Sequence, residues 1–145
     1  MYHLIGELKR LNNLVLRKIG QDEVLKAQEE ITGARGYLIG YVLKQNSLGK
    51  VVYQKDIEKA FSLRRSSATQ ILNSLEKSGL ICRKSQDLDK RLKEIVVTEK
   101  GKETHKIIIQ RLDIIDNDLI NKLTTEELEV FKVVVEKLKE GLSSD

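Results

Sequence analysis

Apolar residues recur at helical spacing along most of the chain and alternate at strand spacing in one stretch near its middle. Because residues three and four apart share one face of a helix, the helical spacing predicts six helices. Their expected ranges are 2–26 with an interruption at Gly20, 32–46 capped by Thr32, 54–61, 64–78, a long helix after Thr98, and a last helix from Thr124 to Gly141. Residues 80–84 and 92–97 are expected to pair around a polar tip, 85–91, as a β-hairpin.

The helix expected at 64–78 has two different faces. Its apolar face can pack inward and consists of Ala68, Ile71, Leu72 and Leu75. Its other face holds only side chains that form hydrogen bonds, namely Arg65, Ser66, Thr69, Gln70 and Asn73. Such side chains can read base edges in a DNA major groove, although a helix face of this kind can also be simply solvated. Gly79 is expected to end the helix as a left-handed cap.

The segments around this helix favour the DNA-binding interpretation. Only Ser62 and Leu63 separate it from the helix at 54–61, and two helices joined this tightly are typical of a helix-turn-helix. The hairpin follows directly, in the position of the wing of a winged helix. Arg91 at its tip could reach the minor groove, where negative potential favours arginine. We therefore expect a mainly α protein with a small β-hairpin wing (α+β), a winged helix-turn-helix.

Apolar residues outside this core exceed what a single chain needs to bury. Ile108, Leu112, Ile115 and Leu119 form one stripe in the helix after Thr98, and further isoleucines make other faces apolar. A partner chain is the economical explanation for so much apolar surface. We expect an N-terminal dimerisation helix at 1–31, a winged helix-turn-helix domain at 32–98 and C-terminal dimerisation helices at 99–145.

Composition and charge narrow the classes of function. The chain has 145 residues with 40% hydrophobic and 33% charged residues, and no apolar run approaches the ~20 residues of a membrane span. No signal peptide is expected, and the single cysteine, Cys82, cannot form an internal disulfide, so a cytoplasmic protein is expected. Residues 50–93 hold eleven bases and five acids, a net charge of +6, whereas residues 112–145 hold four bases and nine acids, a net charge of −5. The basic segment suits a polyanion, and one of its lysines at 50, 55 and 59 is expected to contact a phosphate.

Catalysis is not indicated by any motif. His3 and His105 have no spacing typical of a triad or a metal site, no phosphate-binding or dinucleotide motif is present, and no cofactor or metal is implied. The paired acids Glu126 and Glu127 are explained by a capping box between Thr124 and Glu127. The remaining alternative is a winged-helix module for protein–protein contact without sequence-specific DNA binding. Its outer face should be neutral or apolar, whereas the face expected here is basic.

The chain resembles the MarR (multiple antibiotic resistance regulator) family of bacterial transcription regulators along nearly its whole length. The matching residues are the run YQKDIEKAFSLRRSSATQILNSLEKSGLI, the wing motif Asp89-x-Arg91-x-Lys93 and the helix start Val97-Thr98-Glu99-Lys100-Gly101. The resemblance implies a homodimer that binds a double-stranded, pseudo-palindromic operator, with Asp89 orienting Arg91 on the DNA. The residues expected to bind DNA are Arg64, Arg65, Ser66, Ser67, Thr69, Gln70, Asn73, Arg83, Lys84, Asp89, Lys90 and Arg91.

The resemblance also bears on regulation. Repression is the default in the family, and many members release DNA when a small lipophilic or phenolic ligand binds between the dimerisation and DNA-binding parts. Arg17 and Tyr37 are candidates to line such a ligand site, with surface exposure and packing as their alternative roles. One branch senses peroxide through a cysteine in the first helix, which this chain lacks. Cys82 is expected to pack as a small apolar side chain, with redox sensing as the minor alternative. Arg64 stands where the family often has a better helix cap.

Overall fold

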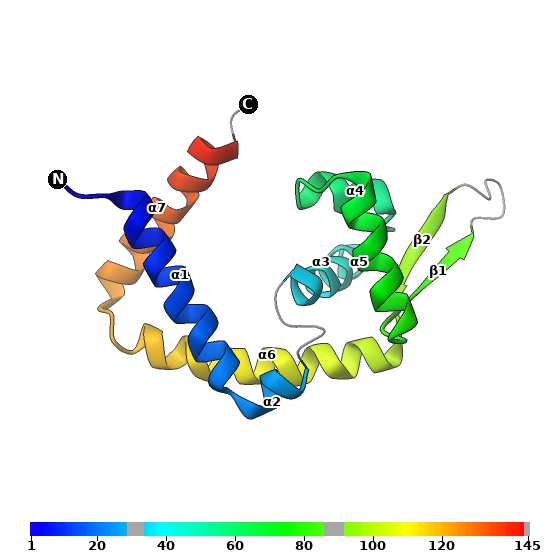
Figure 1. Ribbon diagram of the computed structural model, residues 1–145, viewed down its shortest axis with the longest axis horizontal. Helices are drawn as coiled ribbons and strands as arrows, with labels where there is room; N and C mark the ends of the chain where they lie inside the picture. Colours follow the sequence, from blue (N-terminus) through cyan, green and yellow to red (C-terminus); the bar gives the residue numbers. More distant parts are fainter. Residues whose placement is uncertain (29–33, 86–91, 144–145) are drawn as a thin grey trace. The chain divides into compact units, whose positions relative to one another are not determined.

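The computed structural model describes residues 1–28, 34–85 and 92–143, and these form seven helices and one two-stranded antiparallel sheet (Figure 1). The elements are α1 Leu4–Gln21, α2 Glu23–Ala27, α3 Ala34–Ser47, α4 Gln54–Ala60, α5 Arg65–Lys77, β1 Ile81–Ser85, β2 Lys93–Val97, α6 Glu99–Ile120 and α7 Thr125–Ser143. The mainly α fold with a small hairpin, expected from the sequence, is confirmed. The chain divides into two compact units, Met1–Ile109 and Gln110–Asp145.

The core of the first unit contains α3, α4, α5 and the hairpin. The side chains with at most 1% exposure there include Leu38, Ile39, Val42, Val52, Ile57, Ala68, Leu72, Leu75, Ile81 and Ile95. In Figure 1, α5 runs beside α4 at one end and reaches the base of the hairpin at the other. The apolar face predicted for α5 is therefore confirmed at three positions, and Ile71 is half-buried. The apolar face of α5 is therefore anchored in this core.

The hairpin is joined to the core through both of its strands. β1 and β2 pair with Ile81 opposite Val97 and Arg83 opposite Ile95. The backbone N–H of Ile95 also donates to the carbonyl of Val52 (2.8 Å), which adds a short extended piece beside β2. Ile95 and Val97 are buried on one side, as the alternation predicted. The tip, 86–91, lies outside the described residues.

Thr98 ties the end of α5 to the start of α6. Its hydroxyl donates to the carbonyl of Gly79 (2.6 Å) and accepts from the backbone N–H of Gly101 (3.1 Å), so it caps α6 as expected. Its own N–H donates to the carbonyl of Leu80 (3.0 Å). Gly79 has φ +75°, the left-handed conformation that an α-helix cap requires and that favours glycine. Thr98, which follows β2, is thus hydrogen-bonded to Gly79 and Leu80, which precede β1, so both ends of the hairpin are held beside the end of α5.

The structure moves several helix ends that were predicted from sequence. The N-terminal helix breaks at Asp22 and not at Gly20, because the Asp22 carboxylate accepts from the N–H groups of Val24 and Leu25 (3.0 Å each) and begins α2. α7 continues past Gly141 to Ser143, since this glycine keeps ordinary helical backbone angles. The predicted cap at Thr32 lies outside the described residues.

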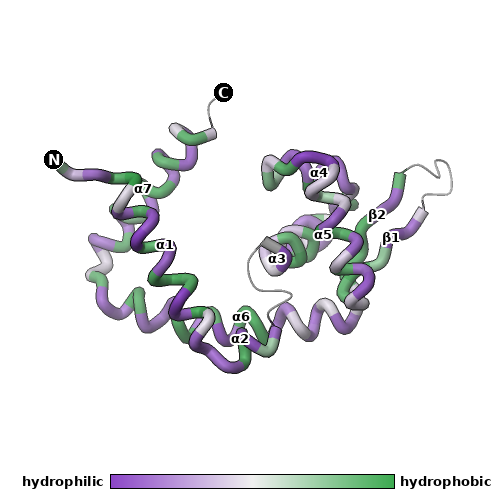
Figure 2. The backbone as a smooth tube through the Cα atoms, viewed as in Figure 1, coloured by the Kyte–Doolittle hydropathy of each residue, from purple (hydrophilic) through white to green (hydrophobic). Residues whose placement is uncertain are grey.

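The second unit contains the end of α6 and all of α7. The predicted capping box is confirmed: the N–H of Thr124 donates to the Glu127 carboxylate (2.9 Å), and the N–H of Glu127 donates to the Thr124 hydroxyl (3.1 Å). Figure 2 shows apolar and polar positions interleaved along α7, and also along α1 in the first unit. Large apolar side chains on both helices are exposed, among them Leu11 (52%) and Phe131 (52%). Among the described residues, no helix combines the length and apolarity needed to cross a membrane.

Candidate nucleic-acid interface

The outward face of α5 is polar over its whole length. Ala68, Leu72 and Leu75 are buried on the opposite side of the helix. The exposed side chains on the outward face include Arg65, Ser66, Gln70 and Asn73, while Ser67 and Thr69 are half-buried at its edges. The sequence therefore placed this face correctly: its exposed groups are hydrogen-bond donors and acceptors of the kind that reads base edges.

The start of α5 is open to solvent. Arg64 is the N-cap residue, and its side chain makes no capping hydrogen bond. Arginine is a weak cap, so the N–H groups of the first turn depend on other partners. Arg64 and Arg65 are both exposed at this end. The positive end of the helix dipole and two guanidinium groups therefore lie together, an arrangement that favours an anion such as a phosphate.

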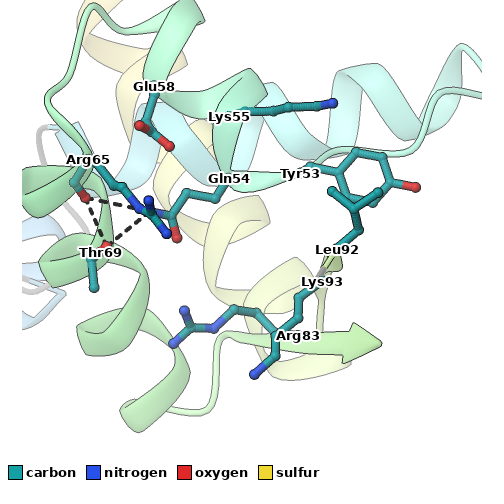
Figure 3. A pocket seen from close by; sticks show the side chains of 9 residues that line it. All are labelled: Tyr53, Gln54, Lys55, Glu58, Arg65, Thr69, Arg83, Leu92 and Lys93. Atoms are coloured by element: carbon teal, nitrogen blue, oxygen red, sulfur yellow. Dashed lines mark hydrogen bonds between the residues drawn. The ribbon is translucent and has the colours of Figure 1, made fainter. Parts of the chain in front are cut away.

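A side-chain bridge fixes α5 to α4. The Gln54 amide donates to the Thr69 hydroxyl (2.9 Å), and this hydroxyl donates to the backbone carbonyl of Arg65 (2.8 Å). Figure 3 shows the three groups converging at the first turns of α5. Thr69 is thereby engaged within the protein, so its first role in this structure is to hold the two helices in register. Gln54 was not identified from sequence, although its place at the first position of α4 could have indicated it.

A basic cleft of about 370 Å³ opens between α4, α5 and the hairpin. Four of its lining side chains are cationic, and one is acidic, Glu58. The cations are Lys55, Arg65, Arg83 and Lys93, and the remaining lining residues are Tyr53, Gln54, Thr69 and Leu92. The Lys55 ammonium also lies 5.8 Å from the centre of the Tyr53 ring, within the range of a cation–π contact. The excess of positive charge suits a phosphate or another anion.

Arg83 does not lie on the outer face of the hairpin, where the basic character of the sequence had suggested it. It is opposite the buried Ile95 in the strand register, so its side chain leaves the core-facing side of β1. From there its Nε donates to Glu76 (2.6 Å), and its Nη2 donates to the Asn73 side-chain carbonyl. Alternation in a five-residue strand allowed either face for an arginine, because its long stem can cover apolar core while the charged head reaches out.

The remaining predicted site residues lie on the hairpin and on α1 and α3. Lys84 is exposed near the end of β1. Asp89, Lys90 and Arg91 fall in 86–91, outside the described residues, so their assignment stays a prediction. The candidates for a ligand site, Arg17 on α1 and Tyr37 on α3, are both exposed, Tyr37 at 70%. Neither lines the basic cleft, and their role in ligand binding stays a prediction as well.

Comparisons with known proteins agree with this architecture. A family profile described as the MarR family matches residues 30–92. The chain is 26% identical over 123 residues to the uncharacterised HTH-type transcriptional regulator YwhA of Bacillus subtilis, covering 85% of this chain and 86% of that protein. The structure of the S. aureus MepR–DNA complex superposes with a TM-score of 0.83 at 24% identity, covering 99% of this chain and 100% of that chain. The haem sensor PefR of Streptococcus agalactiae, solved with haem, gives a TM-score of 0.69 at 23% identity over 99% and 96%.

Proposed function

We propose that the chain, whose residues 30–92 match the MarR family profile, is a transcription regulator of this family that binds a pseudo-palindromic DNA operator as a homodimer. In this proposal α5 lies in the major groove, and the wing at 85–91 lies at the neighbouring minor groove. One observation carries the proposal: the outward face of α5 is exposed and polar, while the opposite face of the helix is packed into the core. MepR, which shares this fold, was solved as a complex with DNA, and this supports the same mode of binding here.

The base-reading residues in this proposal are on the exposed side of α5. Arg65 can donate two hydrogen bonds to a guanine, and Gln70 can pair with an adenine, because these side chains match the major-groove edges of those bases. Ser66 and Ser67 supply hydroxyls near the helix start, where recognition helices usually approach the bases. The bridge from Gln54 to Thr69 supports this reading role, because it prevents α5 from shifting against α4.

Phosphate contacts come from the rim of the same face. Arg64 is exposed at the start of α5 and Lys84 is exposed on β1, and Lys55 and Lys93 line the basic cleft between α4, α5 and the hairpin. Asp89, Lys90 and Arg91 at the wing tip are assigned to the backbone and the minor groove by their resemblance to the family's wing motif. Each phosphate that a cation neutralises releases counterions, so binding should weaken as salt rises.

A homodimer accounts for the apolar side chains left exposed in the first and last helices. Leu4, Leu8, Leu11 and Val15 fall on one stripe of α1, and all four are exposed. In the second unit, Leu119, Phe131 and Val134 are exposed as well. Isolated exposed apolar residues need no partner, but stripes of this kind mark an interface. Two-fold symmetry would place two copies of α5 on successive turns of a palindromic site.

We propose repression, and release by a small lipophilic or phenolic ligand, as the regulatory mode of this cytoplasmic protein, with binding rather than catalysis as its activity. The family resemblance supports repression, and the PefR complex with haem shows that one protein of this fold binds a small molecule. Arg17 and Tyr37 are the candidates to contact the ligand. Salicylate, a phenolic probe, should weaken operator binding in the wild type and lose this effect when both residues are replaced by alanine. An equal effect in wild type and double variant would contradict the assignment.

The experiment that tests the proposal is selection of bound sites from random-sequence duplex DNA at two salt concentrations. Enrichment of an inverted repeat, with half-sites about one helical turn apart, is the expected result. The Gln70→Ala variant should lose preference at one position of each half-site, whereas Lys132→Ala, on exposed α7, serves as the control that leaves the motif unchanged. Weak, salt-sensitive binding without an enriched sequence would contradict the proposal and favour a protein partner instead.

A further inference from the structure

Arg83 links the hairpin to the C-terminal half of α5 through two hydrogen bonds. Its Nε donates to the Glu76 carboxylate at 2.6 Å, and its Nη2 donates to Oδ1 of Asn73. The Arg83 side chain is only 21% exposed, while that of Glu76 is 42% exposed. The side chain as a whole is therefore largely enclosed by its own protein, and two donors of its guanidinium are already engaged without DNA.

The spacing of the two acceptors explains why arginine stands at this position. Asn73 and Glu76 are three residues apart, so they lie one above the other on the same face of α5. A planar guanidinium presents donors along separate edges and can serve both acceptors at once, whereas an ammonium is a point charge without this fixed geometry. Glu76 places a negative charge on the helix that is proposed to bind DNA. Its ion pair with Arg83 compensates this charge.

The contact determines which end of the Asn73 amide is available. Because Oδ1 accepts from Arg83, the Nδ2 amino group is the part left for an external partner, and Asn73 itself is exposed. A hydrogen bond from a charged donor is about twice as strong as a neutral one, so Arg83 opposes rotation of the amide. The pair with Glu76 holds the guanidinium in place while it does so.

We propose that Arg83 is a positioning residue for DNA specificity: it holds Asn73 as a hydrogen-bond donor toward the major groove. This inference rests on the proposed function. Asparagine recognises adenine through two bonds, one donated to N7 and one accepted from the N6 amino group. Arg83 already occupies one of the two lone pairs of Oδ1 and orients this oxygen toward the guanidinium, so the second bond is disfavoured. Asn73 then selects a base-edge acceptor, such as guanine O6 or N7 or thymine O4, and has no particular preference for adenine.

The central variant is Arg83→Lys, which keeps the positive charge but removes the planar guanidinium with its two donor edges. The Asn73→Ala variant should identify the operator position that Asn73 contacts, because this position loses its base preference. In site selection with Arg83→Lys, the preference for adenine at that same position should increase. The gain should be about 5- to 150-fold relative to the wild-type base, the range of one good bidentate contact. Adding Arg83→Lys to Asn73→Ala should change nothing further at that position. Arg10→Ala is the matched control, since it removes an exposed arginine paired with Glu7 on α1.

Two results from the DNA experiment would overturn the proposal. One is an unchanged base preference in Arg83→Lys. The other is a fall of about one unit in the salt slope of Arg83→Ala with base preferences kept, because that is the behaviour of a direct phosphate contact. If the wild-type chain enriches no sequence at all, that result contradicts the proposed function. The positioning role of Arg83 is then tested by a measurement on the protein without DNA.

Nuclear magnetic resonance of the free protein tests the geometry without DNA. The Nε–H signal of Arg83 should exchange slowly with water in the wild type and rapidly in Glu76→Gln, and the Nδ2 signals of Asn73 should shift in Arg83→Lys. Fast exchange in the wild type, or Asn73 signals that do not respond to the Arg83 substitution, would overturn the proposal whatever the DNA experiment shows.

Discussion

Replacing Gly101 by alanine is predicted to destabilise the first unit, although alanine normally strengthens a helix. Gly101 lies in the first turn of α6 and is buried. A Cβ built there would lie 2.2 Å from the carbonyl oxygen of Leu80 and 2.7 Å from Cγ1 of Val97. Contacts this short essentially never occur, so the start of α6 and the α5–β1 connection would have to separate by about 1 Å.

The magnitude follows from two opposing terms. Alanine gains about 1 kcal/mol over glycine inside a helix. Overpacking against backbone costs about 1–3 kcal/mol, and displacing the Leu80 carbonyl also weakens its bond from the Thr98 N–H (3.0 Å), worth about 0.5–1.5 kcal/mol. The net expectation is a free energy of unfolding lowered by about 0.5–3.5 kcal/mol. Because Thr98 and Leu80 join the hairpin to α5, operator affinity should fall with it.

The assay is urea unfolding followed by circular dichroism, at one fixed protomer concentration because a dimer is expected. Gly20→Ala and Gly141→Ala are the matched controls, since each glycine lies within a helix and a Cβ there would meet no atom within 4 Å. Both controls should be stabilised, or at least not destabilised. A Gly101→Ala protein as stable as the wild type would refute the packing argument at the base of the hairpin.

Three further predictions concern DNA, the dimer and pH. Arg65→Ala should cost about 1–3 kcal/mol and relax specificity at one operator position, measured by competition binding; an equal loss on all sequences would make Arg65 a phosphate contact. Asp substitutions at the exposed Leu119 and Val134 should give monomers in sedimentation experiments, and a dimeric double variant would exclude that interface. Burial lowers the pKa of His105 from 6.5, so unfolding should become easier as pH falls below about 6.5, and His105→Gln should remove this part of the pH dependence.

Much of the fold could be predicted because its signals are local. The buried face of α5 followed from residues three and four apart, and the capping box of Thr124 and Glu127 followed from a four-residue pattern. Gly79 could be assigned as a cap because the left-handed conformation disfavours other residues. The helix ends predicted at Gly20 and Gly141 were wrong, because a glycine permits a helix to end but does not require it. The first helix ends instead at Asp22, where the carboxylate accepts from the N–H groups that begin α2.

The candidate site was only partly predictable, because its missing parts are long-range contacts. The exposed positions of Arg65 and Gln70 followed from helical periodicity. The pairing of Arg83 with Asn73 and Glu76, which are ten and seven residues away along the chain, depends on how β1 leaves the core. The bridge between Gln54 and Thr69 likewise depends on the packing of two helices. Residue types alone indicated a basic DNA-binding face and could not separate the groups that read DNA from those that position them.

Dimethyl sulfate footprinting of the wild-type protein on its selected operator tests most directly whether α5 reads the major groove. This reagent methylates guanine N7 in the major groove and adenine N3 in the minor groove. We predict protected guanine N7 atoms in two patches about one helical turn apart, where the two copies of α5 lie, with protected adenine N3 atoms beside them at the wings. Specific binding without protection of guanine N7 in operator half-sites that contain guanine would contradict the placement of α5 in the major groove.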